Sequence, residues 1–257
     1  MRSSSAGSRR PQADTIARVI PQTVLVFGAR HLGRTIVTGF ARAGWNVAAV
    51  ARSQETIRTL GDALPDALGI VADASREDEV ERAVAGVRAR FGRLDLVVNA
   101  ITARPRGGFG GGSILEARRA ALEPYVDELL PAIFNVVAVG SRVLAEEGGG
   151  TLVQITGGSA RRGMPGRGAW AAAAFATRAL IQSAALELRE RGVHVALLIV
   201  DATIESPKTA ALLEDRPKDA SASEEDVVAA VEYLANQSPR GWTHELQITP
   251  RLDRWVP

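Results

Sequence analysis

The stretch TVLVFGARHLGR, residues 23–34, joins a short apolar run to two glycines and the start of an amphipathic segment. The apolar run at 23–27 predicts a buried strand, and the pattern over 31–43, ended by Gly44, predicts a helix. Between such elements Gly28 permits a tight turn, and Gly33 lets the helix pack closely with its amide groups facing a phosphate. A plain strand-to-helix turn is the other interpretation of the same two glycines.

The alternation of apolar runs and amphipathic stretches continues along the chain. Further strands are predicted at 47–50, 68–71, 94–98, 151–155, 193–200 and 244–248, and further helices at 54–64, 77–91, 168–191 and 224–235. Short apolar strands that alternate with helices are typical of parallel sheets buried on both faces. We therefore predict an α/β fold: one doubly wound, Rossmann-type domain with a parallel seven-stranded sheet flanked by helices.

Composition excludes several classes of protein. The 257 residues are 46% hydrophobic and 23% charged, with a formal net charge of +2, which is ordinary for a soluble globular domain. The arginines are spread along the chain, which argues against a nucleic-acid patch. No cysteine is present, so disulfides and thiolate metal sites are excluded, and a cytoplasmic location is expected with no metal. No apolar run reaches the roughly 20 residues of a membrane span.

The first residues differ from the rest. Residues 1–21 are rich in Ser, Arg and Gly, and the pair Arg9-Arg10 precedes Pro11. A paired arginine can belong to an export signal, but no adequate apolar region follows it. We predict a disordered basic leader over 1–21 and a single domain over 22–257.

The end of the second predicted strand bears on the cofactor. An NAD-binding unit usually places an acidic residue here, against the ribose 2′-hydroxyl. This chain has Ala51 and then Arg52, whose guanidinium suits a 2′-phosphate, and Arg30 in the glycine turn adds a second cation. The pair predicts NADP(H) over NAD(H); two solvated surface arginines are the alternative.

From about Thr23 to Ile248 the chain resembles the short-chain dehydrogenase/reductase family. Asp73-Ala74-Ser75 looks like the adenine-contacting turn of the family, and Asn99-Ala100 looks like the start of its Asn-Asn-Ala-Gly signature. The run at 150–155 resembles the strand that delivers the catalytic serine. The resemblance implies an oxidoreductase with NADP(H), a small-molecule substrate, and cofactor contacts at Gly28, Arg30, His31, Leu32, Gly33, Arg52, Asp73, Ala74, Asn99 and Ala100.

The chain also departs from the family pattern. The glycine turn is one residue short and lacks the middle glycine. Gly157 falls where the serine is expected, Trp170 replaces the tyrosine and Ala174 the lysine, and Val200-Asp201 replaces a Pro-Gly turn. The usual proton-transfer groups are therefore missing.

Several residues are candidates for a role in catalysis or in binding the substrate. Ser159 lies two residues beyond the expected serine, and Asn135 lies in the helix that holds a proton-relay asparagine in the family. Arg161, or Arg162 beside it, could stabilise negative charge, unless both are solvated. Trp170 offers a flat apolar surface for an aromatic substrate, or packs in the core.

Two function classes follow. The first is an NADPH-dependent ketoreductase acting on an aromatic or conjugated carbonyl, as in natural-product tailoring, with the proton supplied by the substrate or by water. The second is a non-redox relative: an NADP-binding regulatory or scaffold protein, or a cyclase or isomerase.

The helix through Phe175 and Leu186 matches the usual subunit interface, so the resemblance implies a dimer or tetramer. Phe109 in the glycine-rich loop 104–112 and the lid at 205–219 are candidate substrate contacts, or surface connections without a role.

Overall fold

The computed structural model describes residues 21–103 and 110–253 of the chain. The predicted leader, except for Pro21, lies outside the described residues, and so does Phe109 with most of its glycine-rich loop. The boundary between leader and domain therefore stays a prediction.

Seven strands form one sheet in the order β3-β2-β1-β4-β5-β6-β7, and every neighbouring pair is parallel. The strands are β1 Thr23–Phe27, β2 Asn46–Ala51, β3 Leu68–Val71, β4 Leu96–Asn99, β5 Gly150–Gly157, β6 Val193–Val200 and β7 Glu245–Ile248. The predicted doubly wound α/β fold is confirmed. The order reverses between β1 and β4, and ligands of such sheets bind beyond the carboxyl ends of the strands at that point.

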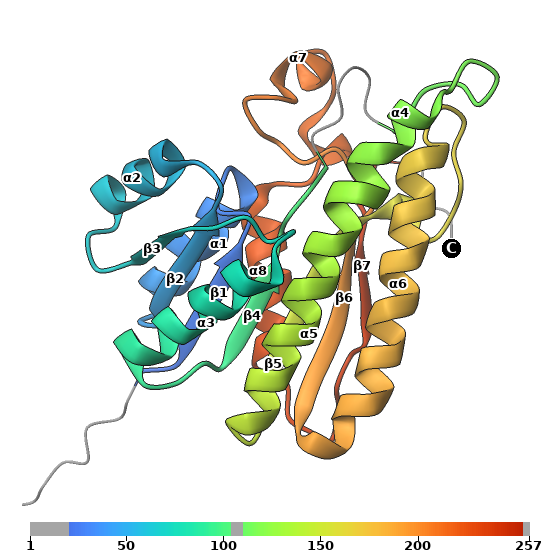
Figure 1. The fold of residues 1–257 in the computed structure, drawn as a ribbon. Helices are drawn as coiled ribbons and strands as arrows, with labels where there is room; N and C mark the ends of the chain where they lie inside the picture. The colour runs from blue at the N-terminus through green and yellow to red at the C-terminus, as the bar shows by residue number, and fades with distance from the viewer. Residues whose placement is uncertain (1–20, 104–109, 254–257) are drawn as a thin grey trace, which may run out of the picture.

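Helices cover both faces of the sheet, with α3, α5 and α6 in front and α1 and α8 behind (Figure 1). The helices are α1 Leu32–Arg42, α2 Gln54–Ala63, α3 Glu77–Phe91, α4 Arg119–Glu123, α5 Leu130–Glu146, α6 Gly168–Leu188, α7 Ala210–Leu213 and α8 Glu224–Ala235. Two apolar cores result, one on each face. The long helix predicted over 168–191 stops at Leu188 and continues as a short 3-10 turn, Arg189–Arg191, before Gly192 at φ 75°.

A continuous helical stretch joins α4 to α5 through a π-helical segment, Pro124–Leu129. By length and composition the whole stretch, Arg119–Glu146, is apolar enough to cross a membrane, contrary to the expectation from its sequence. However, 56% of its most apolar window is buried inside the domain, as in the core helix of a soluble protein.

His194 lies at the amino end of β6, buried against its neighbours. Its ring stacks on Trp242 with centroids 5.1 Å apart, and its Nε2 lies 3.0 Å from the carbonyl oxygen of Thr243. Burial lowers the pKa of His194, and the nearby His244 lowers it further, while the Thr243 hydrogen bond opposes the shift. The folded protein therefore holds this imidazole neutral at a pH where the unfolded chain begins to protonate it.

This contact predicts a loss of stability in mild acid. Because the folded pKa lies below the unfolded value of about 6.5, the unfolded state binds more protons as the pH falls through that value. We expect the melting temperature to fall between pH 7.5 and 5.5, and to fall less in His194→Gln, which cannot take up the proton. Equal pH dependence of the two proteins in calorimetry would show that another group controls acid sensitivity.

Candidate active site

The turn between β1 and α1 contains two glycines, Gly28 and Gly33, at positions where no larger residue fits. Gly28 has φ 88°, and a Cβ there would lie 2.8 Å from the carbonyl carbon and oxygen of Ala100. A Cβ on Gly33 would lie 2.2 Å from the carbonyl oxygen of Gly28. The helix that begins at Leu32 therefore starts directly beneath the end of β1, which brings its free amide groups to the mouth of the turn.

Cations surround this turn. His31, in front of α1, is the single described non-glycine residue with a positive φ, 49°, and it stands where the middle glycine was expected. Burial lowers the pKa of His31 most; Lys208, Arg30 and Arg34 add to the lowering, while the Glu224 carboxylate opposes it. The positive potential at the start of α1 suits a bound anion, since helix amides and side chains carry the same sign there.

The turn after β3 is held by two sets of hydrogen bonds. The Asp73 carboxylate accepts from the Ser75 amide at 3.0 Å and from its hydroxyl at 2.8 Å. The Asn135 side-chain amide donates to the Ala74 carbonyl at 3.0 Å. Asn135 therefore packs against the turn after β3; the relay role expected for it has no contact to support it, and a role in positioning Ala74 fits the geometry.

Asn99 ends β4, fully buried beside Gly28 in the neighbouring strand connection. Its Oδ1 accepts from the backbone amide of Ile101 at 3.2 Å. Phe27 and Asn99 pair in the parallel ladder between β1 and β4. The bond from Asn99 fixes the Ala100 backbone against which Gly28 must fit.

At the end of β5 the expected serine position is Gly157, and the Trp170 indole lies over it. A Cβ on Gly157 would stand 3.6 Å from Cζ2 and 3.7 Å from Nε1 of Trp170. On its other side Trp170 meets Tyr125, with ring centroids 6.0 Å apart, and the Tyr125 hydroxyl accepts from the Gly110 amide at 2.6 Å. Trp170 is only 9% exposed, so this geometry favours the core-packing interpretation over a substrate platform.

Ser159 does not face an open site. It lies in the 3-10 turn Gly158–Ala160 and is 1% exposed. Its Oγ makes no hydrogen bond to any described residue. A catalytic role would require a rearrangement of this turn, and the prediction has no support in the geometry.

The two arginines after β5 are both paired. Arg162 binds Asp201 through two bonds, of 2.6 and 3.0 Å, and Arg161 lies 4.0 Å from Glu245. A Cβ on Gly158 would lie 1.9 Å from the Asp201 Oδ1, so glycine at 158 is what allows this carboxylate to sit at the end of β6. Neither guanidinium stands ready for a developing negative charge in this arrangement.

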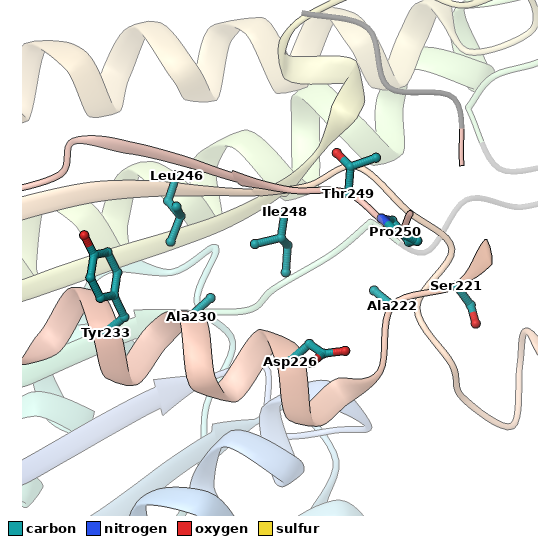
Figure 2. Close-up of a pocket in the computed structure, with 9 residues that line it drawn as sticks. All are labelled: Ser221, Ala222, Asp226, Ala230, Tyr233, Leu246, Ile248, Thr249 and Pro250. Carbon is teal, nitrogen blue, oxygen red and sulfur yellow. The ribbon is translucent and has the colours of Figure 1, made fainter. Parts of the chain in front are cut away.

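A cavity of about 410 Å³ opens between α8 and β7 (Figure 2). Its described lining is mostly apolar, with Tyr233 and Ala230 on α8 facing Leu246 and Ile248 on β7. None of these lining residues is one of the predicted site residues. The cavity is therefore separate from the candidate site at the carboxyl ends of β1, β2 and β4.

Comparison with known proteins identifies the family to which the chain belongs. The model of the short chain dehydrogenase family matches residues 22–216. The chain belongs to the short-chain dehydrogenase family.

Curated members of the short-chain dehydrogenase family are similar at low identity. Sorbitol dehydrogenase of Cereibacter sphaeroides is 28% identical over 181 residues, 69% of each chain. A 3-oxoacyl-[acyl-carrier-protein] reductase of Staphylococcus aureus is 27% identical over 180 residues, 68% of this chain and 71% of the relative. Sorbitol-6-phosphate 2-dehydrogenase of Escherichia coli is 29% identical over 199 residues, 74% of each chain.

Solved structures of the short-chain dehydrogenase fold superpose on nearly the whole domain. A short-chain type dehydrogenase/reductase from Mycobacterium ulcerans has a TM-score of 0.79 at 25% identity, covering 88% of this chain and 87% of its own. ElxO, solved with NADP bound, has a TM-score of 0.78 over 89% of this chain and 97% of its own. At 18% identity the likeness to ElxO concerns the fold alone.

Within this short-chain dehydrogenase domain the predicted residues fall into two groups. The residues of the cofactor half, from Gly28 to Ala100, gather at the carboxyl ends of β1 to β4. The catalytic candidates do not converge: Asn135 faces Ala74, and Arg161 faces Glu245. Sequence reasoning missed Lys208 and Glu128, because only the fold brings the lid segment to His31 and the π-helical segment to Arg52.

Proposed function

We propose that this protein binds NADP(H) at the carboxyl ends of β1 and β2 and reduces a small aromatic or conjugated carbonyl compound in the cytoplasm. The observation that carries the proposal is the turn at the start of α1. Its two glycines let α1 begin close against the Gly28 carbonyl and the Ala100 backbone, and the cations and helix amides there favour a diphosphate. Membership of an oxidoreductase family supports the redox chemistry.

Each group of the cofactor half has a separate task. Gly28 and Gly33 would hold the close turn that presents the α1 amides to the pyrophosphate, with Arg30 supplying charge and the neutral His31 a hydrogen bond. Arg52 would bind the 2′-phosphate. Asp73 and Ala74 would contact the adenine, and Asn99 and Ala100 would add further contacts to the cofactor. The nicotinamide would supply the hydride when bound.

The proton must then come from outside the family's usual residues. Gly157 has no side chain, Ala174 has no charge, and the indole of Trp170 releases no proton near neutral pH. A hydroxyl next to the substrate carbonyl, or an ordered water, would stabilise the oxyanion and donate the proton. Positioning alone can contribute roughly 7–11 kcal/mol to catalysis, so reduction without a tyrosine is chemically reasonable.

A non-redox NADP-binding protein is the second candidate. The buried Trp170 favours it, because the indole occupies the space in which the family holds its proton donor. A regulatory, scaffold, cyclase or isomerase role would keep the cofactor half and dispense with hydride transfer.

One experiment separates these candidates. We expect the purified protein to bind NADPH, measured by the change in its fluorescence, and to consume NADPH with aryl ketones that carry a neighbouring hydroxyl, faster than with plain aryl ketones. Binding without consumption of NADPH on either set would reject the reductase and favour the second candidate. Arg52→Asp should weaken NADPH binding and shift the preference towards NADH, which tests the cofactor separately.

We also propose that the protein self-associates through α6. Phe175 and Leu186 are 45% and 67% exposed on this helix, and Phe134 of α5 is 57% exposed beside it. Large exposed apolar side chains on adjacent helices are suited to burial against a second copy. A dimer or tetramer in light scattering is the expected result.

A further inference from the structure

Arg52 has an acidic neighbour from a distant part of the chain. Its Nη1 lies 4.0 Å from Oε2 of Glu128, and the two side chains are 49% and 59% exposed. Arg52 follows β2, whereas Glu128 belongs to the π-helical segment Pro124–Leu129 before α5. The cation proposed for the 2′-phosphate therefore already faces a carboxylate across the site.

The continuous helix that carries Glu128 makes a second contact with the residues proposed to bind the adenosine. Asn135 follows Glu128 by seven residues, about two helical turns, which places both on one side of the continuous helix. Asn135 bonds to Ala74 after β3, and Glu128 faces Arg52 after β2. In the same segment Tyr125 is fully buried and Leu129 is buried, so the segment is anchored in the core.

We infer that Glu128 is a specificity-determining residue of the proposed adenosine-binding site. Its carboxylate opposes the attraction of Arg52 for a 2′-phosphate. The inference rests on the proposed NADP(H) function. A 2′-phosphate bound to Arg52 would come close to the Glu128 carboxylate, and its negative charge would be repelled. A ribose 2′-hydroxyl carries no charge and can donate a hydrogen bond to the same carboxylate.

The expected consequence is a preference for NADPH over NADH that is weaker than Arg52 alone would give. Both side chains are about half exposed, so water and salt screen their interaction and the effect is moderate. Removal of the Glu128 charge should tighten NADPH binding and leave NADH binding unchanged or weaker. The preference for NADPH over NADH would then increase.

The test compares Kd values of NADPH and NADH for the full chain and two variants, by fluorescence titration at low salt. Glu128→Gln removes the charge and keeps the side-chain shape. Asp127→Asn is the matched control, because Asp127 is the adjacent residue with similar exposure but faces Arg119 at 3.7 Å. Unchanged circular dichroism spectra and melting temperatures confirm that both variants fold.

We expect Glu128→Gln to raise the ratio of the NADH Kd to the NADPH Kd by about three- to tenfold. Asp127→Asn should leave the ratio within about twofold of the parent value. An unchanged ratio in Glu128→Gln, or an equal rise in both variants, overturns this inference while NADPH binding by the parent protein still supports the proposed function. Failure of the parent to bind either nucleotide overturns both.

Discussion

Trp170→Ala is expected to lower the free energy of unfolding by about 3–5 kcal/mol, the usual cost of truncating a large buried aromatic side chain. The indole is 9% exposed and fills the space between Gly157 at the end of β5 and the Tyr125 ring. Truncation would leave a cavity in the core on the α5 and α6 face of the sheet. Chemical denaturation of the two proteins measures the difference.

Phe175→Ala is the matched control, because Phe175 lies on the same helix and is 45% exposed. We expect its cost to stay below about 1 kcal/mol in the monomer. If Trp170→Ala costs no more than Phe175→Ala but abolishes substrate binding, the indole is a substrate platform, as the other interpretation of the sequence has it. A large loss of stability instead identifies Trp170 as a structural replacement for the tyrosine.

Gly33→Ala is expected to weaken nucleotide binding and to destabilise the fold by about 1–3 kcal/mol or more. The new Cβ would lie 2.2 Å from the carbonyl oxygen of Gly28, so α1 must move away from the end of β1. A displaced α1 would no longer present its amides in the same place, so the Kd of NADPH should rise by about tenfold or more, equal to about 1.4 kcal/mol of binding free energy.

Gly61→Ala provides the control for Gly33→Ala. Gly61 is also inside a helix, α2, and a Cβ there meets no atom within 4 Å. Alanine should stabilise this exposed position by up to about 1 kcal/mol and leave NADPH binding unchanged. Equal NADPH affinity in Gly33→Ala and Gly61→Ala would mean that the glycine turn does not hold the cofactor.

The fold was predictable because its signals are local. Each strand is a short apolar run, and each of α1, α3 and the 3-10 turn after α6 is followed by a glycine at or just beyond its end, which marks the boundary in the sequence. Gly28 and Gly33 could be assigned to a close strand-to-helix turn from their spacing alone. The structure adds the reason, which is contact with the Ala100 backbone and with Gly28 itself.

The surroundings of the residues proposed for catalysis were less predictable, because their contacts join residues that lie far apart in the sequence. Spacing placed Trp170 at the tyrosine position, but not whether the indole faces a substrate or the core. The partner of Arg162 is Asp201, 39 residues away, and the partner of Asn135 is Ala74, 61 residues away. A stretch of sequence around either residue contains no sign of these pairs.

The contact between Gly157 and Trp170 also constrains how this protein can change over generations. A Cβ at 157 would meet the indole at 3.6 Å, which is an ordinary van der Waals contact, so alanine fits beside the ring. Residue 157 can therefore gain a small side chain while Trp170 keeps its place, whereas replacement of Trp170 carries the cost in stability expected above.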